Sequence, residues 1–233
     1  MKIFFKGFNF SQDGPGNRLV YHLQGCNMRC PWCSNPEGMA FSGGSEYSTE
    51  QIVMECIRSR AMFFSGGGVT FTGGEATMQY KDLVEVLKRL RAESIHTALE
   101  TNGISEHLPE IQQHVDYLVM DFKHYDRDAF KKFTGVSIEP LLKNYEYLCR
   151  TQRQMHIRIP LINHINAENP RGFAEYLSGF DTANAVFEFL PYHEYGKEKW
   201  KSEYLIEDGF VSKDQLRAFH MIFAEYHLKT IHA

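Results

Sequence analysis

Three cysteines stand close together in the run "CNMRCPWC", at Cys26, Cys30 and Cys33. Gly25 and Pro31 lie in the same stretch, where the backbone can curl so that three thiolates converge on one metal or cluster. A structural zinc site normally takes four ligands as two separated pairs, and the sequence has no second CxxC pair. A four-iron, four-sulfur cluster normally takes four cysteines. Three cysteines would leave one iron open, and an open position on a metal is typical of a reactive site.

Two other interpretations of this run stay open at this point. One is a zinc loop completed by a histidine such as His22, and the other is a redox pair formed by Cys30 and Cys33. The remaining cysteines, Cys56 and Cys149, occupy apolar helix faces. We expect these two to be inert buried thiols.

The composition is that of a globular protein, with 233 residues of which 43% are hydrophobic and 23% charged. Because no repeat or linker interrupts it, we expect a single domain over residues 1–233. The formal net charge of −4 gives no reason to expect a nucleic-acid partner or an anionic membrane surface. No apolar run approaches the ~18 residues of a membrane span, and "MKIFFKGFNF" lacks the features of a signal peptide. We therefore predict a cytoplasmic monomer, in which clustered cysteines serve a metal or catalysis rather than disulfides.

Short β-rich runs alternate with helical patterns from about residue 19 onward. The predicted strands cover residues 18–24, 68–73, 96–101, 117–122, 155–160 and 185–191. Between them, segments such as 49–64 and 80–93 place apolar residues at i, i+3, i+4 and i+7, which is typical of a helix with one buried face. Such alternation implies parallel strands joined by right-handed crossovers. The predicted fold class is therefore α/β, as an open (βα)6 partial TIM barrel or a doubly wound sheet.

In both architectures the functional residues collect at the carboxyl ends of the strands. The candidate residues lie at these ends, in chain order Cys26; Gly73, Gly74 and Glu75; Glu100 and Thr101; Asp121 and Lys123; Arg158, late in its strand; and His193. The sequence therefore predicts one site along that edge.

The glycine pair and the two charged residues of the fourth strand suggest ligand contacts. Gly73 and Gly74 would expose backbone N–H and C=O groups to a ligand, and the carboxylate of Glu75 can bind an ammonium group. Ordinary turn glycines are the alternative. Asp121 and Lys123 project from the same strand face, because they are two positions apart. A charged pair that faces a barrel interior favours ligand binding over a plain salt bridge.

Three features near the last two strands have two interpretations each. Arg158 can bind a ligand carboxylate, or it can pair with a barrel acid such as Glu188. His193 lies in a loop with proline, tyrosine and glycine, where a solvated histidine is as common as a functional one. We expect "GKEKWK", residues 196–201, to be a solvated rim, with partner contact as the alternative.

The motifs taken together resemble one family. "DGPGNR" (13–18), CxxxCxxC, "GGGVTFTGGEA", "ETNG", "MDFK" and "LPYHEYGKEKW" follow one another as in the glycyl-radical enzyme activating enzymes of the radical S-adenosylmethionine superfamily. The resemblance is closest to those that activate pyruvate formate-lyase, and it runs from about residue 13 to 200. Only 34 residues separate Cys33 from Gly68, with one cysteine among them, so the chain resembles the compact form without a ferredoxin-like insertion.

The resemblance implies two cofactors and a set of contacts to them. One 4Fe-4S cluster would be bound by Cys26, Cys30 and Cys33, and S-adenosylmethionine would chelate its open iron. The implied contacts to S-adenosylmethionine are Gly73, Gly74 and Glu75 at the methionine amino group; Thr101, Asp121, Lys123 and His193 elsewhere; and Trp32 near the adenine. In the family, the strand-end acid and threonine also help bind a monovalent cation. Here that acid is Glu100, where close relatives usually have aspartate, and the longer carboxylate can displace or abolish the cation site.

The implied activity is that of an oxidoreductase of anaerobic metabolism. It would cleave S-adenosylmethionine reductively and remove hydrogen from the α-carbon of one glycine in a partner enzyme. The electron would come from flavodoxin or ferredoxin. Pyruvate formate-lyase is the first candidate partner, although Ser34 stands where its activators usually have histidine, which weakens that assignment.

The partner contacts and the class of substrate have alternatives. As a hypothesis, Asp13 and Arg18 contact the partner's glycine loop; a tight lead-in turn would explain "DGPGNR" equally well. The same radical chemistry could act on a small molecule, as in proteins like 7-carboxy-7-deazaguanine synthase. A third possibility is a zinc-stabilised binding protein without catalysis.

Overall fold

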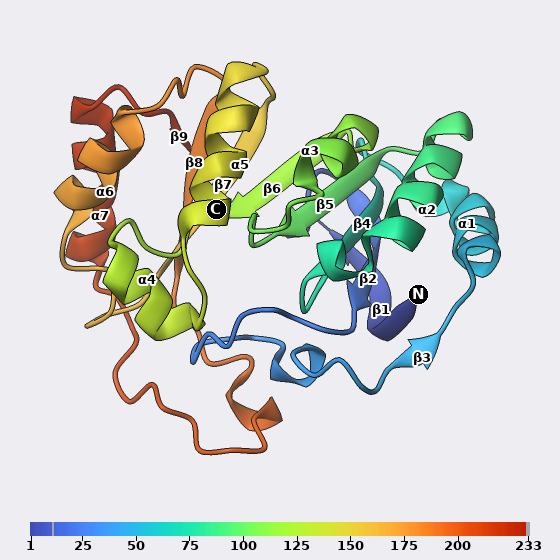
Figure 1. Ribbon diagram of the computed structural model, residues 1–233, viewed down its shortest axis with the longest axis horizontal. Helices are drawn as coiled ribbons and strands as arrows, with labels where there is room; N and C mark the ends of the chain where they lie inside the picture. Colours follow the sequence, from blue (N-terminus) through green and yellow to red (C-terminus); the bar gives the residue numbers. More distant parts are fainter. Residues whose placement is uncertain (11, 232–233) are drawn as a thin grey trace. The chain divides into compact units, whose positions relative to one another are not determined.

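The path of the chain is shown in Figure 1, a computed structural model that describes residues 1–10 and 12–231. The chain forms two compact units. Unit 1 contains residues 1–27, 37–101 and 105–119, and unit 2 contains residues 28–36, 102–104 and 120–233. The cysteine run is divided, because Cys26 belongs to unit 1 whereas Cys30 and Cys33 belong to unit 2. The single domain over residues 1–233 stays a prediction.

Unit 1 is built on a mixed β-sheet with the strand order β3-β1-β2-β4-β5-β6. The strands are β1 (Lys2–Phe10), β2 (Asn17–Leu23), β3 (Ser45–Glu46), β4 (Gly68–Gly73), β5 (Thr97–Thr101) and the first three residues of β6 (Tyr117–Asp121). β1 pairs with β2 in the antiparallel sense, whereas β2, β4 and β5 are parallel to one another. The ends of these parallel strands therefore meet at one edge of the unit.

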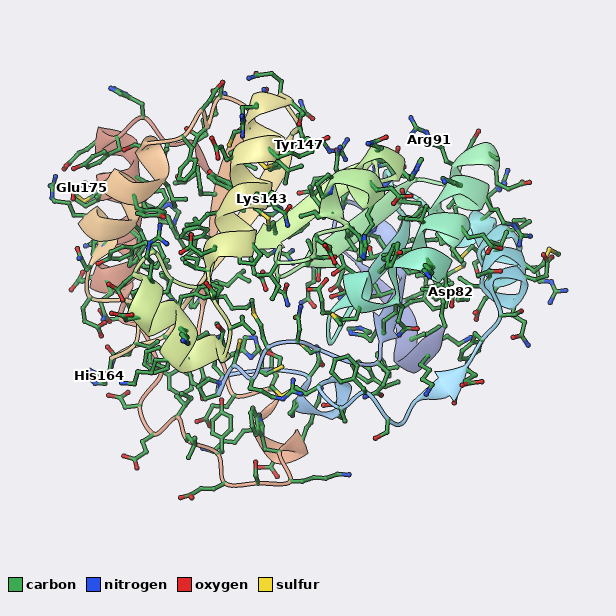
Figure 2. All side chains as sticks on the ribbon, in the orientation of Figure 1. Asp82, Arg91, Lys143, Tyr147, His164 and Glu175 are labelled. Atoms are coloured by element: carbon green, nitrogen blue, oxygen red, sulfur yellow. The ribbon has the colours of Figure 1, made fainter. Side chains whose placement is uncertain are left out.

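Helices cover one face of the unit 1 sheet. They are α1 (Thr49–Arg58), α2 (Tyr80–Ala92) and the short α3 (Leu108–Ile111), with 3-10 turns at Pro36–Gly38, Arg60–Met62, Ala76–Gln79 and Gln112–His114. The side chain of Ser48 caps α1 in a capping box with Gln51. α1 and α2 lie side by side (Figure 1). Figure 2 shows charged residues such as Asp82 and Arg91 on the outer side of α2, while its leucines and valines are buried.

Unit 2 continues with the end of β6 and the parallel strands β7 (Met155–Leu161), β8 (Ala185–Pro191) and β9 (Thr230–Ile231), in the order β6-β7-β8-β9. Its helices are α4 (Arg127–Thr134), α5 (Glu139–Arg150), α6 (Pro170–Ser178) and α7 (Lys213–Glu225), with a 3-10 turn at Lys197–Lys199. The core is strongly aromatic, since Phe122, Phe173, Phe187, Phe219 and Phe223 are all fully buried. α6 and α7 pack against each other (Figure 1).

The six predicted strands correspond to β2, β4, β5, β6, β7 and β8, and each boundary is correct to within one residue. The sequence analysis missed β1, β3 and β9. A register shift between Ile3 and Phe5 interrupts the alternation of β1, and β3 and β9 have only two residues each. The helix predicted over 49–64 ends at Arg58, where a 3-10 turn follows it.

No helix among residues 1–10 and 12–231 combines the length and the apolar character that crossing a membrane requires.

Candidate active site

The glycine pair at the end of β4 packs against the backbone of unit 1 itself. Gly73 has a φ of +120°, and a Cβ atom there would lie 2.3 Å from the amide nitrogen of Leu23. At Gly74 a Cβ would lie 2.3 Å from the carbonyl oxygen of Gly38 and 2.6 Å from that of Gly25. Only glycine fits such close approaches. Part of the glycine requirement is therefore structural, because the end of β4 docks beside the residue that precedes Cys26.

Glu75 is the centre of a buried hydrogen-bond network in unit 1. Glu75 is only 2% exposed. Its Oε1 accepts hydrogen bonds from the Thr77 amide (3.0 Å) and from the Thr77 hydroxyl (2.6 Å). The hydroxyl of Thr101, at the end of β5, donates to the same oxygen at 2.8 Å. The structure thus brings together Glu75 and Thr101, two of the predicted site residues, by the ends of neighbouring parallel strands.

Glu100 points to the opposite side of β5 from Thr101, as the alternation of a strand requires. Its Oε2 accepts a hydrogen bond of 3.0 Å from the hydroxyl of Thr72 on β4. The charge of Glu100 also acts on Arg18, in β2. Burial lowers the pKa of the Arg18 guanidinium to about 10, while Glu100, Asp116 and Asp13 act in the opposite direction.

The segment "DGPGNR" forms a tight turn at the start of β2. Thr70 donates to the carbonyl of Asp13 at 2.6 Å, and Asn9 donates to the Asp13 carboxylate. The Arg18 guanidinium donates to the carbonyl of Pro15 (3.0 Å) and to the hydroxyl of Thr70 (2.6 Å). The side chain of Arg18 is 0% exposed, so it cannot contact a partner directly as predicted. It holds the lead-in turn from inside; a partner contact by the half-buried Asp13 stays a prediction.

None of the five cysteines forms a disulfide, and they lie in two kinds of environment. Burial raises the pKa of the Cys56 thiol to about 12 and that of the Cys149 thiol to about 11, as expected for inert core thiols. Cys26, Cys30 and Cys33 lie instead in the loop between β2 and the 3-10 turn at Pro36–Gly38. No group of three or more His, Cys, Asp or Glu side chains in the described part of the chain is arranged to hold a metal ion. Convergence of these three thiolates on one cluster stays a prediction.

The cysteine loop is anchored separately in each unit. In unit 1 the Cys26 amide donates to the carbonyl of Met39 at 3.1 Å. In unit 2 the Arg29 amide donates to the carbonyl of Thr134, at the end of α4, at 2.9 Å. Trp32 packs against a small buried cluster of Ile162, Tyr192 and Ile206. A role of Trp32 at the adenine stays a prediction.

Asp121 and Lys123 bind each other in unit 2. The Lys123 ammonium lies 2.7 Å from Asp121 Oδ2, and the two side chains are 11% and 36% exposed. The structure therefore contains a plain salt bridge between Asp121 and Lys123, which was the alternative to ligand binding. Contact of either side chain with a cofactor stays a prediction.

Arg158 of β7 forms an ion pair with Glu188 of β8, the barrel acid that the sequence suggested. Arg158 Nε donates to Glu188 Oε2 at 2.8 Å, and His156 Nε2 lies 2.9 Å from the same oxygen. Burial alone would raise the pKa of the Glu188 carboxyl, but the hydrogen bond from His156 and the charge of Arg158 outweigh it and lower that pKa. The sequence analysis missed His156, although its position two residues before Arg158 places both on one strand face.

His193 follows β8 and is half-buried. Its Nδ1 accepts a hydrogen bond of 3.3 Å from the Tyr195 amide, and its ring stacks on that of Tyr195 at 4.2 Å. Burial lowers the pKa of the His193 imidazole, so the ring is neutral near pH 7. The four charged residues of 196–201 are exposed, as the prediction of a solvated rim requires, but Lys199 and the half-buried Trp200 also bind the cysteine loop.

Comparison with known proteins identifies the family. The sequence profile described as "Radical SAM superfamily" matches residues 20–177. The chain is 36% identical over 194 residues to a pyruvate formate-lyase-activating enzyme of Clostridium pasteurianum, covering 81% of each chain. It is 34% identical over 202 residues to the enzyme of the same name from Staphylococcus epidermidis, covering 82% of this chain and 80% of the relative.

Solved structures agree with this assignment. A domain of the pyruvate-formate lyase-activating enzyme from Bacteroides vulgatus has a TM-score of 0.62 and 29% identity, and covers 72% of this chain and 99% of that one. Streptococcus suis SuiB, at 16% identity, covers 92% of this chain and 48% of its own with a TM-score of 0.70, and so shares the fold. The chain belongs to the radical SAM superfamily and, within it, to the family of the pyruvate formate-lyase-activating enzymes. The predictions of a partial-barrel radical SAM fold and of an enzyme of this family are confirmed.

Proposed function

We propose that this chain activates a glycyl-radical enzyme, with pyruvate formate-lyase as the first candidate partner. The observation that carries the proposal is the conjunction of a CxxxCxxC loop without disulfides with a buried carboxylate, Glu75, directly after a glycine strand end. The names of the relatives at 32–36% identity support the same activity.

The donor set fits a 4Fe-4S cluster. Cys26, Cys30 and Cys33 offer three soft thiolate ligands from one loop, and none of them is used in a disulfide. A bound cluster would supply the electron for reductive cleavage of S-adenosylmethionine. The cleavage would supply a radical that removes hydrogen from a glycine of the partner. The protein's own task is to orient the cofactor and to keep other hydrogen donors away from it.

Glu75 and Arg158 carry charges opposite to those of the ammonium and carboxylate groups of methionine. Glu75, held in place by two threonine hydroxyls, would bind the ammonium group. Arg158, oriented by Glu188, would bind the carboxylate. The neutral ring of His193 and the Asp121–Lys123 pair would contact the remainder of the cofactor, with Trp32 beside the adenine.

Several finer points complete the proposal. Flavodoxin or ferredoxin would deliver the electron, and the protein would work in the cytoplasm as a monomer. Glu100, bound to Thr72, would replace the aspartate that helps hold a monovalent cation in relatives, so we expect a weak or absent cation site.

Anaerobic reconstitution tests the proposal. The purified chain is incubated with iron and sulfide, reduced, and supplied with S-adenosylmethionine. We expect a brown protein that releases methionine and 5′-deoxyadenosine, with no product from the Cys33→Ala variant and full activity in Cys149→Ala. A colourless protein with stoichiometric zinc would contradict the proposal in favour of a zinc-stabilised binding protein.

A further inference from the structure

The loop between β8 and α7 lies against the cysteine loop within unit 2 (Figure 1). It contains "GKEKWK", with a 3-10 turn at Lys197–Lys199 that ends at Trp200. The cysteine loop residues 28–36 belong to the same unit. Two segments that are about 165 residues apart in the chain therefore share one local structure.

Two side chains of this turn bind the backbone that follows Cys33. The indole Nε1 of Trp200 donates to the carbonyl oxygen of Cys33 at 3.1 Å. The ammonium of Lys199 donates to the carbonyl of Ser34 and to the side-chain oxygen of Asn35, both at 3.1 Å. Carbonyl groups of a loop need such partners, because no strand or helix supplies them.

Gly196 lets the turn approach this closely. Its backbone has φ −92° and ψ −11°, a conformation that any residue adopts. A Cβ at this position would nevertheless lie 2.6 Å from the carbonyl oxygen of Cys33 and 2.6 Å from the Cα of Ser34. The glycine is therefore required for space and not for backbone freedom.

Two tyrosines, Tyr204 and Tyr192, connect this turn to the core of unit 2. The ring of Trp200 meets that of Tyr204 edge-on at 5.7 Å, and the hydroxyl groups of Tyr204 and Tyr192 are 2.7 Å apart. Tyr192 belongs to the buried cluster with Ile162 and Ile206, against which Trp32 also packs. Both tryptophans of the chain are thus tied to the same cluster, one directly before Cys33 and one on its carbonyl.

A path of contacts leads from Lys199 to the sulfur atom. The side chain of Asn35 accepts from Lys199, and the backbone amide of Asn35 points at Cys33 Sγ over 3.4 Å. Amide hydrogen bonds to a ligating sulfur help set the reduction potential of an iron–sulfur cluster. Fixing Asn35 therefore fixes a group that acts on the thiolate.

We propose that Gly196, Lys199 and Trp200 form a strap that positions Cys33 as a cluster ligand and holds the Asn35 amide on its sulfur. This inference rests on the proposed function, because it assumes that Cys33 binds a cluster. The three are positioning residues, since they act through the backbone of Cys33–Asn35.

The test compares Trp200→Phe, Lys199→Met and Gly196→Ala with a matched control, Lys197→Met. Lys197 lies in the same turn and pairs with Glu194 at 2.9 Å. Trp200→Phe keeps an aromatic ring beside Tyr204 and removes the N–H donor together with the second ring of the indole. Circular dichroism checks that each variant is folded, and Gly179→Ala serves as the control for adding a methyl group in unit 2.

Three quantities are measured. In the reconstituted protein we expect Trp200→Phe and Lys199→Met to lose iron to a chelator about fivefold faster than wild type, the equivalent of one hydrogen bond. The midpoint potential of the cluster should shift to more negative values in Lys199→Met, because the Asn35 donor becomes mobile. In the apo protein the alkylation rate of Cys33 should rise about fivefold, while that of Cys56 stays unchanged.

The outcomes separate the strap from the proposed function. A wild-type chain that takes up no cluster contradicts the proposed function, and with it the positioning role. The second outcome is a wild-type chain that binds the cluster while all three variants behave like Lys197→Met in iron loss, midpoint potential and Cys33 alkylation. That outcome overturns the strap and leaves the proposed function intact. If Gly196→Ala fails to fold, Trp200→Phe and Lys199→Met still decide the result.

Discussion

Two buried carboxylates, Glu75 after the end of β4 and Glu188 in the middle of β8, are held in different ways in the two units. In unit 1, Glu75 accepts hydrogen bonds from two threonine hydroxyls and an amide. In unit 2, Glu188 accepts a hydrogen bond from the Arg158 guanidinium and lies 2.9 Å from His156 Nε2. Neutral donors hold a carboxylate in place without cancelling its charge, whereas a cationic partner cancels it. Under the proposed function, Glu75 would bind the ammonium group of the cofactor, and Glu188 would orient Arg158.

The largest change in stability should come from breaking the ion pair between Glu188 and Arg158. Glu188→Gln removes the carboxylate charge from the ion pair with the guanidinium of Arg158, which is only 12% exposed. We expect the free energy of unfolding to fall by about 3–5 kcal/mol, the usual result of removing one member of a buried ion pair. Urea unfolding measures it. The exposed pair of Arg171 and Glu225 supplies the control, since Glu225→Gln should change stability by less than about 1 kcal/mol.

The next largest change concerns cofactor affinity and the hydrogen bonds from Thr77 and Thr101 to Glu75 in unit 1. Glu75→Gln keeps an oxygen that can accept from Thr77 and Thr101, but removes the negative charge. We expect affinity for S-adenosylmethionine to fall roughly 10- to 100-fold in the reconstituted enzyme, with little loss of stability. Calorimetric titration measures this, with Glu85→Gln on the outer side of α2 as the control. Unchanged affinity would remove Glu75 from the ammonium site.

A pH titration sharpens the comparison further. Because the pKa of Glu188 is lowered below its ordinary 4.5, its ionisation stabilises the fold fully above pH 4.5. That contribution is lost as the pH falls from 4.5 through the folded-state pKa. The stability difference between wild type and Glu188→Gln should therefore be constant near neutrality and shrink in acid. A difference that stays constant down to pH 3 would show that the charge of Glu188 is not what stabilises the pair.

The smallest effect concerns Glu100. Shortening it to aspartate gives up the 3.0 Å hydrogen bond from Thr72 and tests the proposal that side-chain length decides whether a cation binds. We expect a change in activity of at most about fivefold, an effect the size of one hydrogen bond, and a new dependence on sodium or potassium. Assays in choline salts, with and without either cation, measure it. Equal cation dependence in both proteins would contradict the link between side-chain length and the cation site.

Much of this arrangement could be predicted from the sequence. The six predicted strands have continuous β-branched and aromatic runs, and the predicted strand ends include Glu75 and Thr101, which a hydrogen bond joins in the structure. The pairing of Arg158 with Glu188 was one of two possibilities, because periodicity gives the strand face but not the partner across strands. β1 was missed since its bulge breaks the alternation.

Contacts between distant segments could not be predicted in the same way. The turn at Lys197–Lys199 is exposed, as its high charge predicts, but only the fold brings the neighbouring Trp200 to the carbonyl of Cys33. The burial of Arg18 was missed for a similar reason. Its partners, Thr70 and the carbonyl of Val69, come from the neighbouring strand β4, and the sequence of the turn contains no sign of them.

Electron paramagnetic resonance of a candidate partner tests the central claim most directly. Reduced, reconstituted enzyme is incubated anaerobically with S-adenosylmethionine and purified pyruvate formate-lyase, with Cys33→Ala as the parallel control. We predict the doublet of a glycyl radical on the partner, absent with Cys33→Ala and with a partner whose radical-site glycine is replaced by alanine. Cleavage of S-adenosylmethionine without a doublet on pyruvate formate-lyase or any other glycyl-radical enzyme would contradict the account and indicate a small-molecule substrate.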